Sequence, residues 1–304
     1  MSKVPRTTNQ MTQPMKNIKI LLLSLLITPV FCFSQEEAKD SIVDKPERPA
    51  FESSSLVDNQ TNEVFVKNTL EIMMQHRFGL VDEDNSLLGI YGANTNIRIG
   101  ASYTILDWLA VGYGITKKNR VSDFNVKAAL LRQTRSGRIP VSVTYYGNMG
   151  IDGRSGSAND SIFILRQDRY SYFHQIVIAK RFSPKFSMLI APSMSHYNTV
   201  DNGYKNDRFS IALGGRYKIS SQTSIIFDYS QPITKLSDDS DINSIYDNPG
   251  ISLGAEFSTS GHAFQLFITN FNGILPQQNS MLNTNDFFDK GLLIGFNITR
   301  RYNF

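Results

Sequence analysis

The sequence contains almost no cysteine and has little overall apolar character. Its single Cys excludes a disulfide scaffold and a Cys-rich zinc module. A mean hydropathy of −0.23, with 41% hydrophobic residues, excludes a bundle of membrane-spanning helices. The chain is instead rich in aromatic residues, with 13 Tyr and 20 Phe among 304 residues, which excludes a disordered chain. This length accommodates one large β domain or two ordinary domains.

The formal net charge of +4 arises at the N-terminus. Residues 1–34 contain no Asp or Glu, and an apolar run from Ile20 to Phe33 is followed by Ser34. A basic start, an apolar run of about 14 residues and a small residue before a polar stretch are typical of a cleavable signal peptide. The run is too short to cross the roughly 30 Å of a bilayer as a helix, which disfavours a membrane anchor. The basic residues of this segment are Lys3, Arg6, Lys16 and Lys19.

Removal of residues 1–34 changes the composition of the remaining chain. It takes away four of the 31 basic residues and the lone Cys32, so the rest carries 27 basic and 27 acidic residues and no thiol. A chain without net charge gives no reason to expect a nucleic-acid partner. We therefore predict an exported protein in three parts: a signal peptide over 1–34, a periplasmic lead-in over 35–66 and a folded domain over 67–304.

Alternating apolar and polar residues dominate the folded domain. At the C-terminus, Ile294, Phe296 and Ile298 share one parity, while Gly295 and Asn297 share the other. A β-strand places two such sets on opposite faces. About twelve segments show this pattern. They cover residues 70–78, 97–103, 109–115, 124–130, 141–149, 170–178, 186–194, 209–219, 225–229, 251–257, 264–268 and 292–304.

Aromatic residues gather near both ends of these segments. The connections between the segments alternate between short and long. Only the connection over 117–120 is short where a long one is expected. The other short connections cover 105–107, 134–140, 183–185, 220–222 and 259–261, and the long ones cover 81–93, 152–167, 199–207, 233–248 and 271–289.

This combination predicts a transmembrane antiparallel up-and-down β-barrel of about 12 strands, with short periplasmic turns and longer extracellular loops. Such a barrel satisfies its backbone polar groups inside a bilayer and leaves no free strand edge. A soluble β-sandwich or lipocalin-like barrel also alternates. Its apolar face points inward, however, and small and charged residues on the other face fit it poorly.

Several stretches carry a resemblance to known membrane barrels. The last residues resemble the insertion signal of Gram-negative outer-membrane barrels, with Phe296, Ile298, Tyr302 and Phe304 at the apolar positions and Arg300 as a departure. Further matching stretches cover residues 70–79, 96–100, 213–218, 261–266 and 295–300. Over residues 51–304 the chain resembles a family of Bacteroidetes outer-membrane β-barrels of unknown function.

The resemblance implies a fold and an outer-membrane location, and it implies no reaction. We accordingly expect three partners: outer-membrane lipid, lipopolysaccharide and the barrel-assembly machinery. Small solutes are a further candidate, because they could pass through a barrel of this kind.

Inward parity places many charged side chains in the barrel interior. Nine are basic and three are acidic, and a low-dielectric passage lined by them would favour anions. A barrel of about twelve strands is narrow, so paired charges could also fill it. Two interpretations stay open: a narrow porin-like pore for small anionic solutes, or a structural or partner-docking barrel with a charge-filled lumen that does not conduct. The inward charges are Glu71, Arg77, Arg98, Lys127, Arg169, Arg181, Arg208, Arg216, Lys218, Asp228, Glu256 and Arg301.

No residues in the sequence form a catalytic, cofactor-binding or metal site, and we expect no enzyme. The four His share outward parity, and none forms a metal-spaced pair. His196 lies next to Ser195, but neighbours in a strand point to opposite faces, so an outer-membrane enzyme is the weakest interpretation. Asp239 and Asp241 resemble the start of a calcium loop, yet the Gly and Glu that such a loop needs later are missing.

The second half of the lead-in is more apolar than a free tail requires. We hypothesise that it packs in or under the barrel as a plug. Its apolar residues are Phe51, Leu56, Val57, Val64, Phe65 and Val66.

Overall fold

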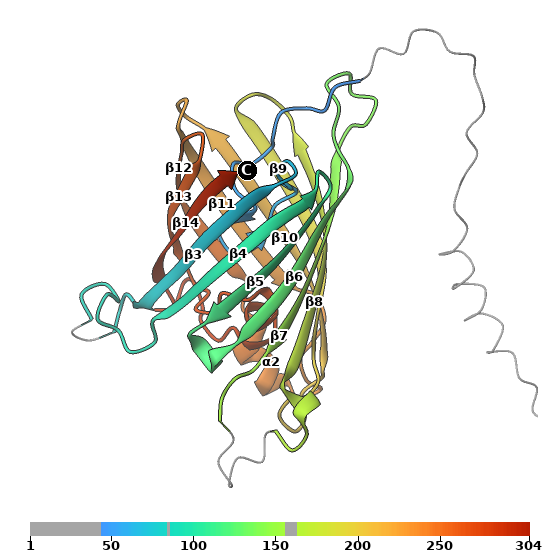
Figure 1. Cartoon of the computed structure of the whole chain (residues 1–304). Helices are drawn as coiled ribbons and strands as arrows, with labels where there is room; N and C mark the ends of the chain where they lie inside the picture. The colour runs from blue at the N-terminus through green and yellow to red at the C-terminus, as the bar shows by residue number, and fades with distance from the viewer. Residues whose placement is uncertain (1–43, 84–85, 156–162) are drawn as a thin grey trace, which may run out of the picture. The chain divides into compact units, whose positions relative to one another are not determined.

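Twelve antiparallel strands form a closed barrel in the computed structural model, which describes residues 44–83, 86–155 and 163–304 (Figure 1). Each strand pairs with its neighbours in sequence, and β14 pairs with β3 to close the ring. This confirms the barrel predicted from alternation. The strands are β3 (Thr69–Leu80), β4 (Asn96–Leu106), β5 (Leu109–Thr116), β6 (Ser122–Leu131), β7 (Ser142–Ile151), β8 (Tyr170–Arg181), β9 (Phe186–Tyr197), β10 (Asp207–Lys218), β11 (Thr223–Pro232), β12 (Gly250–Ser258), β13 (His262–Thr269) and β14 (Leu293–Asn303).

Short helices occupy some of the connections between strands. They are the 3-10 helices η1 (Lys118–Arg120) and η2 (Arg166–Arg169) and the α-helices α2 (Ser240–Tyr246) and α3 (Pro276–Leu282). Within the described ranges, no helix has the length and apolar character needed to cross a membrane. The predicted signal peptide over residues 1–34, with Cys32, lies outside the described residues.

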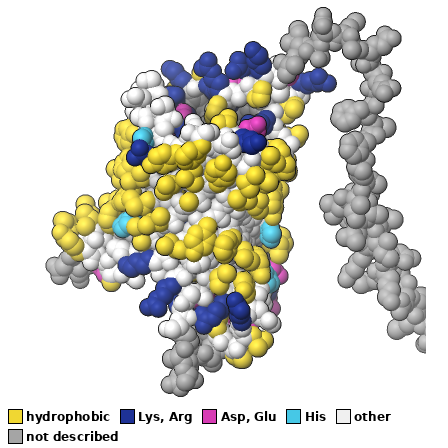
Figure 2. Space-filling view, viewed as in Figure 1, with side chains coloured by type: hydrophobic (Ala, Val, Ile, Leu, Met, Phe, Trp, Pro, Cys, Tyr) yellow, Lys and Arg dark blue, Asp and Glu magenta, His cyan; other side chains and the backbone are white. Residues whose placement is uncertain are grey.

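The barrel wall has an apolar outer face and a mixed inner face. In β8, Ser171, Phe173 and Gln175 are buried in the interior, whereas Tyr172 and His174 between them face outward. Figure 2 shows the outward apolar side chains as a belt between two ends that carry Lys and Arg. Lipid offers no hydrogen bonds, so a closed ring of paired strands inside an apolar belt suits a bilayer.

The two ends of the barrel differ in the length of their connections. Five short connections and the C-terminus lie at one end, which we call the short-turn end (Figure 1). The other connections, including those that hold η1, η2, α2 and α3, lie at the opposite end, which we call the long-loop end. The structure therefore confirms the predicted alternation, and the short connection over 117–120 holds η1.

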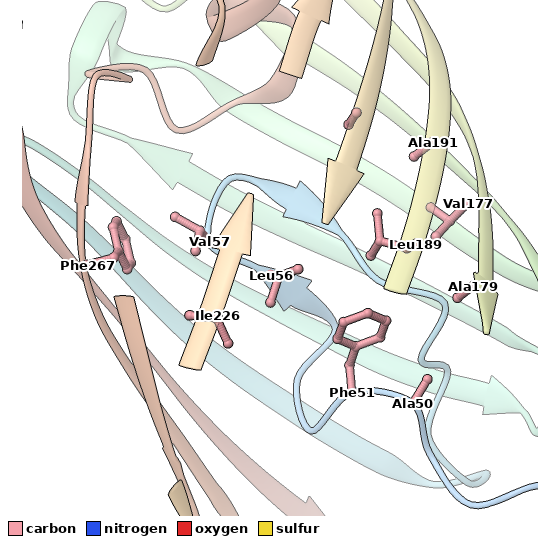
Figure 3. Close-up of a cluster of buried hydrophobic side chains, with 11 residues drawn as sticks. Ala50, Phe51, Leu56, Val57, Val177, Ala179, Leu189, Ala191, Ile226 and Phe267 are labelled. Carbon is pink, nitrogen blue, oxygen red and sulfur yellow. The ribbon is translucent and has the colours of Figure 1, made fainter. Parts of the chain in front are cut away.

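Residues 50–66, which we call the inner segment, lie inside the barrel apart from the exposed Val66 at its end (Figure 3). Strands β1 (Ser55–Leu56) and β2 (Asn59–Gln60) form a small hairpin there. Phe51, Leu56 and Val57 are buried in one apolar cluster with inward residues of the wall. A water-filled lumen would not favour apolar side chains on the inner face, and here they pack against the inner segment instead. The wall residues of this cluster are Val177, Ala179, Leu189, Ala191, Ala212, Ile226 and Phe267.

The polypeptide enters and leaves the inner segment at the short-turn end. Before it, the Glu47 N–H donates to the Gln133 carbonyl at 2.7 Å, in the connection between β6 and β7. After it, the Asn68 N–H donates to the Thr104 carbonyl at 2.9 Å, near the last residues of β4. The chain thus enters and leaves the lumen through the same mouth.

We predict that Phe51→Ala loosens the inner segment without opening the barrel wall. The Phe51 side chain is 2% exposed, and truncation of a buried Phe costs about 3–5 kcal/mol. Limited proteolysis of the refolded protein should therefore cut residues 44–66 faster, while the heat-modifiable gel shift of the barrel stays unchanged. Val66→Ala is the matched control, because Val66 is 61% exposed. Equal cleavage rates for the two variants would show that Phe51 does not hold the segment.

Candidate functional site in the barrel interior

The most deeply buried ion pair joins the inner segment to the wall. Arg77 Nη2 on β3 lies 2.8 Å from Asp58 Oδ1, and the two side chains are 0% and 2% exposed. The other Asp58 oxygen accepts hydrogen bonds from the hydroxyls of Ser252 and Thr269. Arg77 also donates to Asn297 Oδ1 at 3.0 Å. Both Asp58 oxygens and both terminal nitrogens of Arg77 are thereby hydrogen-bonded, as a buried ion pair requires, while the buried Arg77 Nε makes no hydrogen bond.

The tip of the inner hairpin is bound by a second carboxylate. Asp228 Oδ2 on β11 accepts the backbone N–H groups of Asp58 and Asn59, both at 3.0 Å. Its Oδ1 accepts the Asn59 side-chain amide at 2.7 Å. Val57, just before, has a φ of 51°, which is unfavourable for a β-branched residue. Its carbonyl accepts from Asn297 Nδ2 at 2.9 Å, so hydrogen bonds to the wall hold this turn.

Two further charged groups bind the first part of the inner segment. Glu71 Oε2 on β3 accepts the Ser54 hydroxyl at 2.6 Å, and Lys127 Nζ on β6 donates to the Ser54 carbonyl at 2.6 Å. Within the segment, Glu63 accepts the N–H groups of Ala50 and Phe51. Burial raises the pKa of the Glu63 carboxyl above its ordinary value, and these two N–H donors oppose that shift.

Basic wall residues nearer the short-turn end pair with acids of the inner segment and lead-in. Arg216 Nε lies 2.8 Å from Glu256 on the wall, and Arg216 Nη2 lies 3.0 Å from Glu52. Lys218 Nζ is 3.9 Å from the same Glu52 oxygen. At the rim, Arg181 Nη1 lies 3.3 Å from Glu47.

A network nearer the long-loop end connects the wall to α3. Arg98 binds Asp123 through two hydrogen bonds of 2.8 and 2.7 Å. Asn148 Nδ2 donates to the same carboxylate at 2.9 Å, and Gln277 of α3 donates to Asn148 Oδ1 at 2.8 Å. Arg208 donates to the Ser280 carbonyl of α3 at 2.9 Å and also binds Asp247. The connection between β13 and β14 is therefore folded into the barrel, which the sequence did not predict.

Two of the predicted inward charges lie at the ends of the barrel, outside the buried ion-pair networks. Arg169 belongs to η2 outside the strands, where it donates to the Asp152 carbonyl and lies over the Phe163 ring. Arg301 lies at the short-turn end, where it donates to the Ser260 carbonyl and lies over Phe65. The remaining predicted charges are those described above.

Sequence reasoning missed several acidic partners. Asp123 has the inward parity of Lys127 on β6 and could have been found by the same rule. Glu52, Asp58 and Glu63 could not, because the lead-in has no period. Among the described residues, five basic and six acidic side chains are buried, so the basic excess given by parity is balanced inside the protein. They are Arg77, Arg98, Lys127, Arg208, Arg216, Asp58, Glu63, Glu71, Asp123, Asp228 and Glu256.

The residues of the C-terminal insertion signal lie on the outer face or at the rim. Phe296, Ile298 and Tyr302 are half-buried on β14, and Phe304 is exposed at its end. Phe296 stacks on His76 with ring centroids 5.1 Å apart. Arg300, the departure from the apolar pattern, lies over the Tyr302 ring at 4.8 Å.

The weighed catalytic and metal candidates remain separate from the interior site. His196 binds Asp207 and Asn198, while the Ser195 side chain is buried on the inner face. In the part of the chain that the structure describes, no three His, Cys, Asp or Glu residues are grouped so that they could hold a metal ion.

The space left inside the barrel is small at the middle of the inner segment and larger near the two mouths. A cavity of about 30 Å³ lies beside Glu71 and Lys127, which is close to the volume of one water molecule. Larger hollows of about 340 and 180 Å³ lie at the short-turn mouth and beside α3. The middle of the barrel is therefore filled mainly by side chains and the inner segment.

Together, the closed strand ring, the apolar outer belt and the charged interior define a transmembrane β-barrel. Residues 51–302 match the family described as "Membrane bound beta barrel domain (DUF5777)", and the chain belongs to that family. The matched range includes the inner segment almost completely.

Solved structures with a similar arrangement are outer-membrane porins and channels. A KdgM porin is 8% identical with a TM-score of 0.43, covering 78% of this chain and 99% of its own. A NanC porin is 8% identical with a TM-score of 0.45, covering 77% and 100%. The COG4313 outer membrane channel from Pseudomonas putida F1 is 10% identical with a TM-score of 0.46, covering 79% and 97%. A search of curated proteins gives no match.

We predict that Asp58→Ala destabilises the folded protein strongly. Removing one partner of a buried ion pair leaves the other charge uncompensated, at a cost of about 3–5 kcal/mol. Urea unfolding in lipid vesicles should show a loss of this size. Asp238→Ala is the matched control, because Asp238 pairs with Lys205 at 2.6 Å on the surface, where ion pairs contribute little. A loss for Asp58→Ala no larger than that of the control would refute the assigned role of the buried pair.

Proposed function

We propose that this chain is an outer-membrane β-barrel for small solutes, closed at rest by its own inner segment. The buried Arg77–Asp58 pair carries the proposal, because it joins the segment to the wall deep inside the lumen. Side chains with no water-accessible surface at that depth are incompatible with an open water-filled channel past them.

The route of the inner segment supports a closure that can be reversed. Both of its connections lie at the short-turn mouth, so it can withdraw without being threaded through the barrel. Most of its bonds to the wall are hydrogen bonds and ion pairs, which water and ions can replace after withdrawal. We therefore assign residues 51–66 the role of a plug within the lead-in over 35–66.

The outer-membrane location rests on the C-terminal aromatic residues and on the expected signal peptide over 1–34. With it come the expected partners: outer-membrane lipid, lipopolysaccharide and the barrel-assembly machinery. The five stretches quoted above support a Bacteroidetes-type member of the family.

A second candidate is a structural or partner-docking barrel whose lumen never opens. It is favoured by the balance of buried charges and by α3, which is bound to Asn148 and Arg208 on the wall. In that case the same ion pairs would serve stability alone.

A reversible tether distinguishes the two candidates. The hydroxyl oxygens of Ser53 and Thr299 are 3.3 Å apart, so cysteines at these positions should be able to form a disulfide. We predict that the full chain with Cys32→Ser conducts in brief openings in a planar bilayer. Adding Ser53→Cys and Thr299→Cys should abolish the openings when oxidised, and a reductant should restore them.

The control is each cysteine alone, which should conduct like the parent with or without oxidant. A folded, inserted parent that is open continuously would refute closure by the inner segment. A folded parent without openings, even with Asp58→Ala, would refute solute passage and support the structural barrel.

A further inference from the structure

Acidic side chains of the inner segment and lead-in form ion pairs with basic side chains of the wall. These pairs follow one another from the mouth inward. Glu47 binds Arg181 at the rim, and Glu52 binds Arg216 and approaches Lys218 one step deeper. These wall residues stand near the short-turn ends of β8 and β10. This part of the wall therefore binds carboxylates, as its contacts with the chain's own acidic side chains show.

Contacts within the wall fix the orientation of the Arg216 guanidinium. Its Nε stays bound to Glu256 at 2.8 Å, and Glu256 also accepts from Gln265 at 3.0 Å. Only Nη2 of Arg216 is directed to Glu52. When Glu52 leaves, the guanidinium keeps its wall partner and its orientation, so a new carboxylate would meet a preorganised donor.

The two acids at the mouth can be reached from solution, unlike Asp58. The side chains of Glu47 and Glu52 are 27% and 29% exposed. A hollow of about 340 Å³ lies beside Glu47 at the same mouth. This hollow is lined by Glu47 and not by Arg181, Arg216 or Lys218. It is therefore the exposure of the two acids that lets a dissolved anion compete for these three cations while the deeper part of the segment is still in place.

We propose that Arg181, Arg216 and Lys218 form a binding site for soluble di- and tricarboxylates, which Glu47 and Glu52 occupy as internal ligands. A multivalent carboxylate that binds there replaces both acids at once and releases the first part of the inner segment. A single carboxylate replaces only one of them and competes poorly. This site rests on the proposed closure, since the ligand opens the plug that we assign to residues 51–66.

Thiol labelling of the inner segment tests this site without any need for conductance. Ser53 is 2% exposed, so a cysteine placed there in the full chain with Cys32→Ser should react slowly with a soluble thiol reagent. Citrate is the probe, compared with chloride at matched ionic strength. At a citrate concentration of roughly ten times its dissociation constant, the labelling rate should rise about tenfold.

Variants at the short-turn mouth distinguish citrate binding at the three cations from a general loosening of the inner segment. Arg216→Gln with Lys218→Gln should abolish the citrate response, and Glu52→Gln should raise the rate before citrate is added. Lys185→Gln, at an exposed position of the nearby turn, should respond to citrate like the parent.

A citrate effect no larger than that of chloride would overturn the site. An equal effect from inorganic phosphate, or from acetate at the same charge concentration, would overturn its assignment to multivalent carboxylates. A barrel that never conducts but still shows the citrate response would refute solute passage and leave the binding site standing.

Discussion

The interior of this barrel is governed by the need to compensate charges that water does not reach. Arg77, with no exposed surface, is opposite Asp58 of the inner segment, and the tip of the same hairpin is bound by Asp228. An unpaired charge in such a place costs several kcal/mol. The wall and the inner segment are therefore complementary in charge, and Arg77 and Asp58 compensate each other across their contact.

The wall and the inner segment are also complementary in shape. On one side of the lumen, small and apolar wall residues such as Ala191 and Ala212 leave room for Phe51 and Leu56. A Cβ atom at Gly214 would lie 2.7 Å from Leu56 Cδ2, and one at Gly100 would lie 2.6 Å from an Arg98 nitrogen. Gly214 thus provides space for the inner segment, and Gly100 provides space for the Arg98 side chain of its own strand. The lumen is thus shaped for an internal occupant.

The sequence predicted the barrel well because its signal is local. A strand that faces lipid on one side repeats every two residues, so β14 and the other strands could be recognised one at a time. The same parity placed Arg77, Arg216 and Glu256 inside. It could not place Asp58, because the hairpin at 55–60 has no period and its position depends on wall residues far away in sequence. It also could not foresee that α3 folds inward, since its buried residues include Gln277 and Asn279, which resemble a solvated loop.

Without the inner segment, the buried wall has five basic and four acidic side chains, so its charge balance changes from slightly acidic to slightly basic when the segment leaves. The buried wall carries Arg77, Lys127 and Arg216, while the inner segment contributes Asp58 and Glu63. In the proposed open state these wall cations lose their internal partners, and water or anions have to replace them. Any anion that binds the vacated wall better than the closed one shifts the balance toward opening by mass action. Opening and anion entry are then thermodynamically linked, and the charge that attracts the solute is the charge that holds the plug.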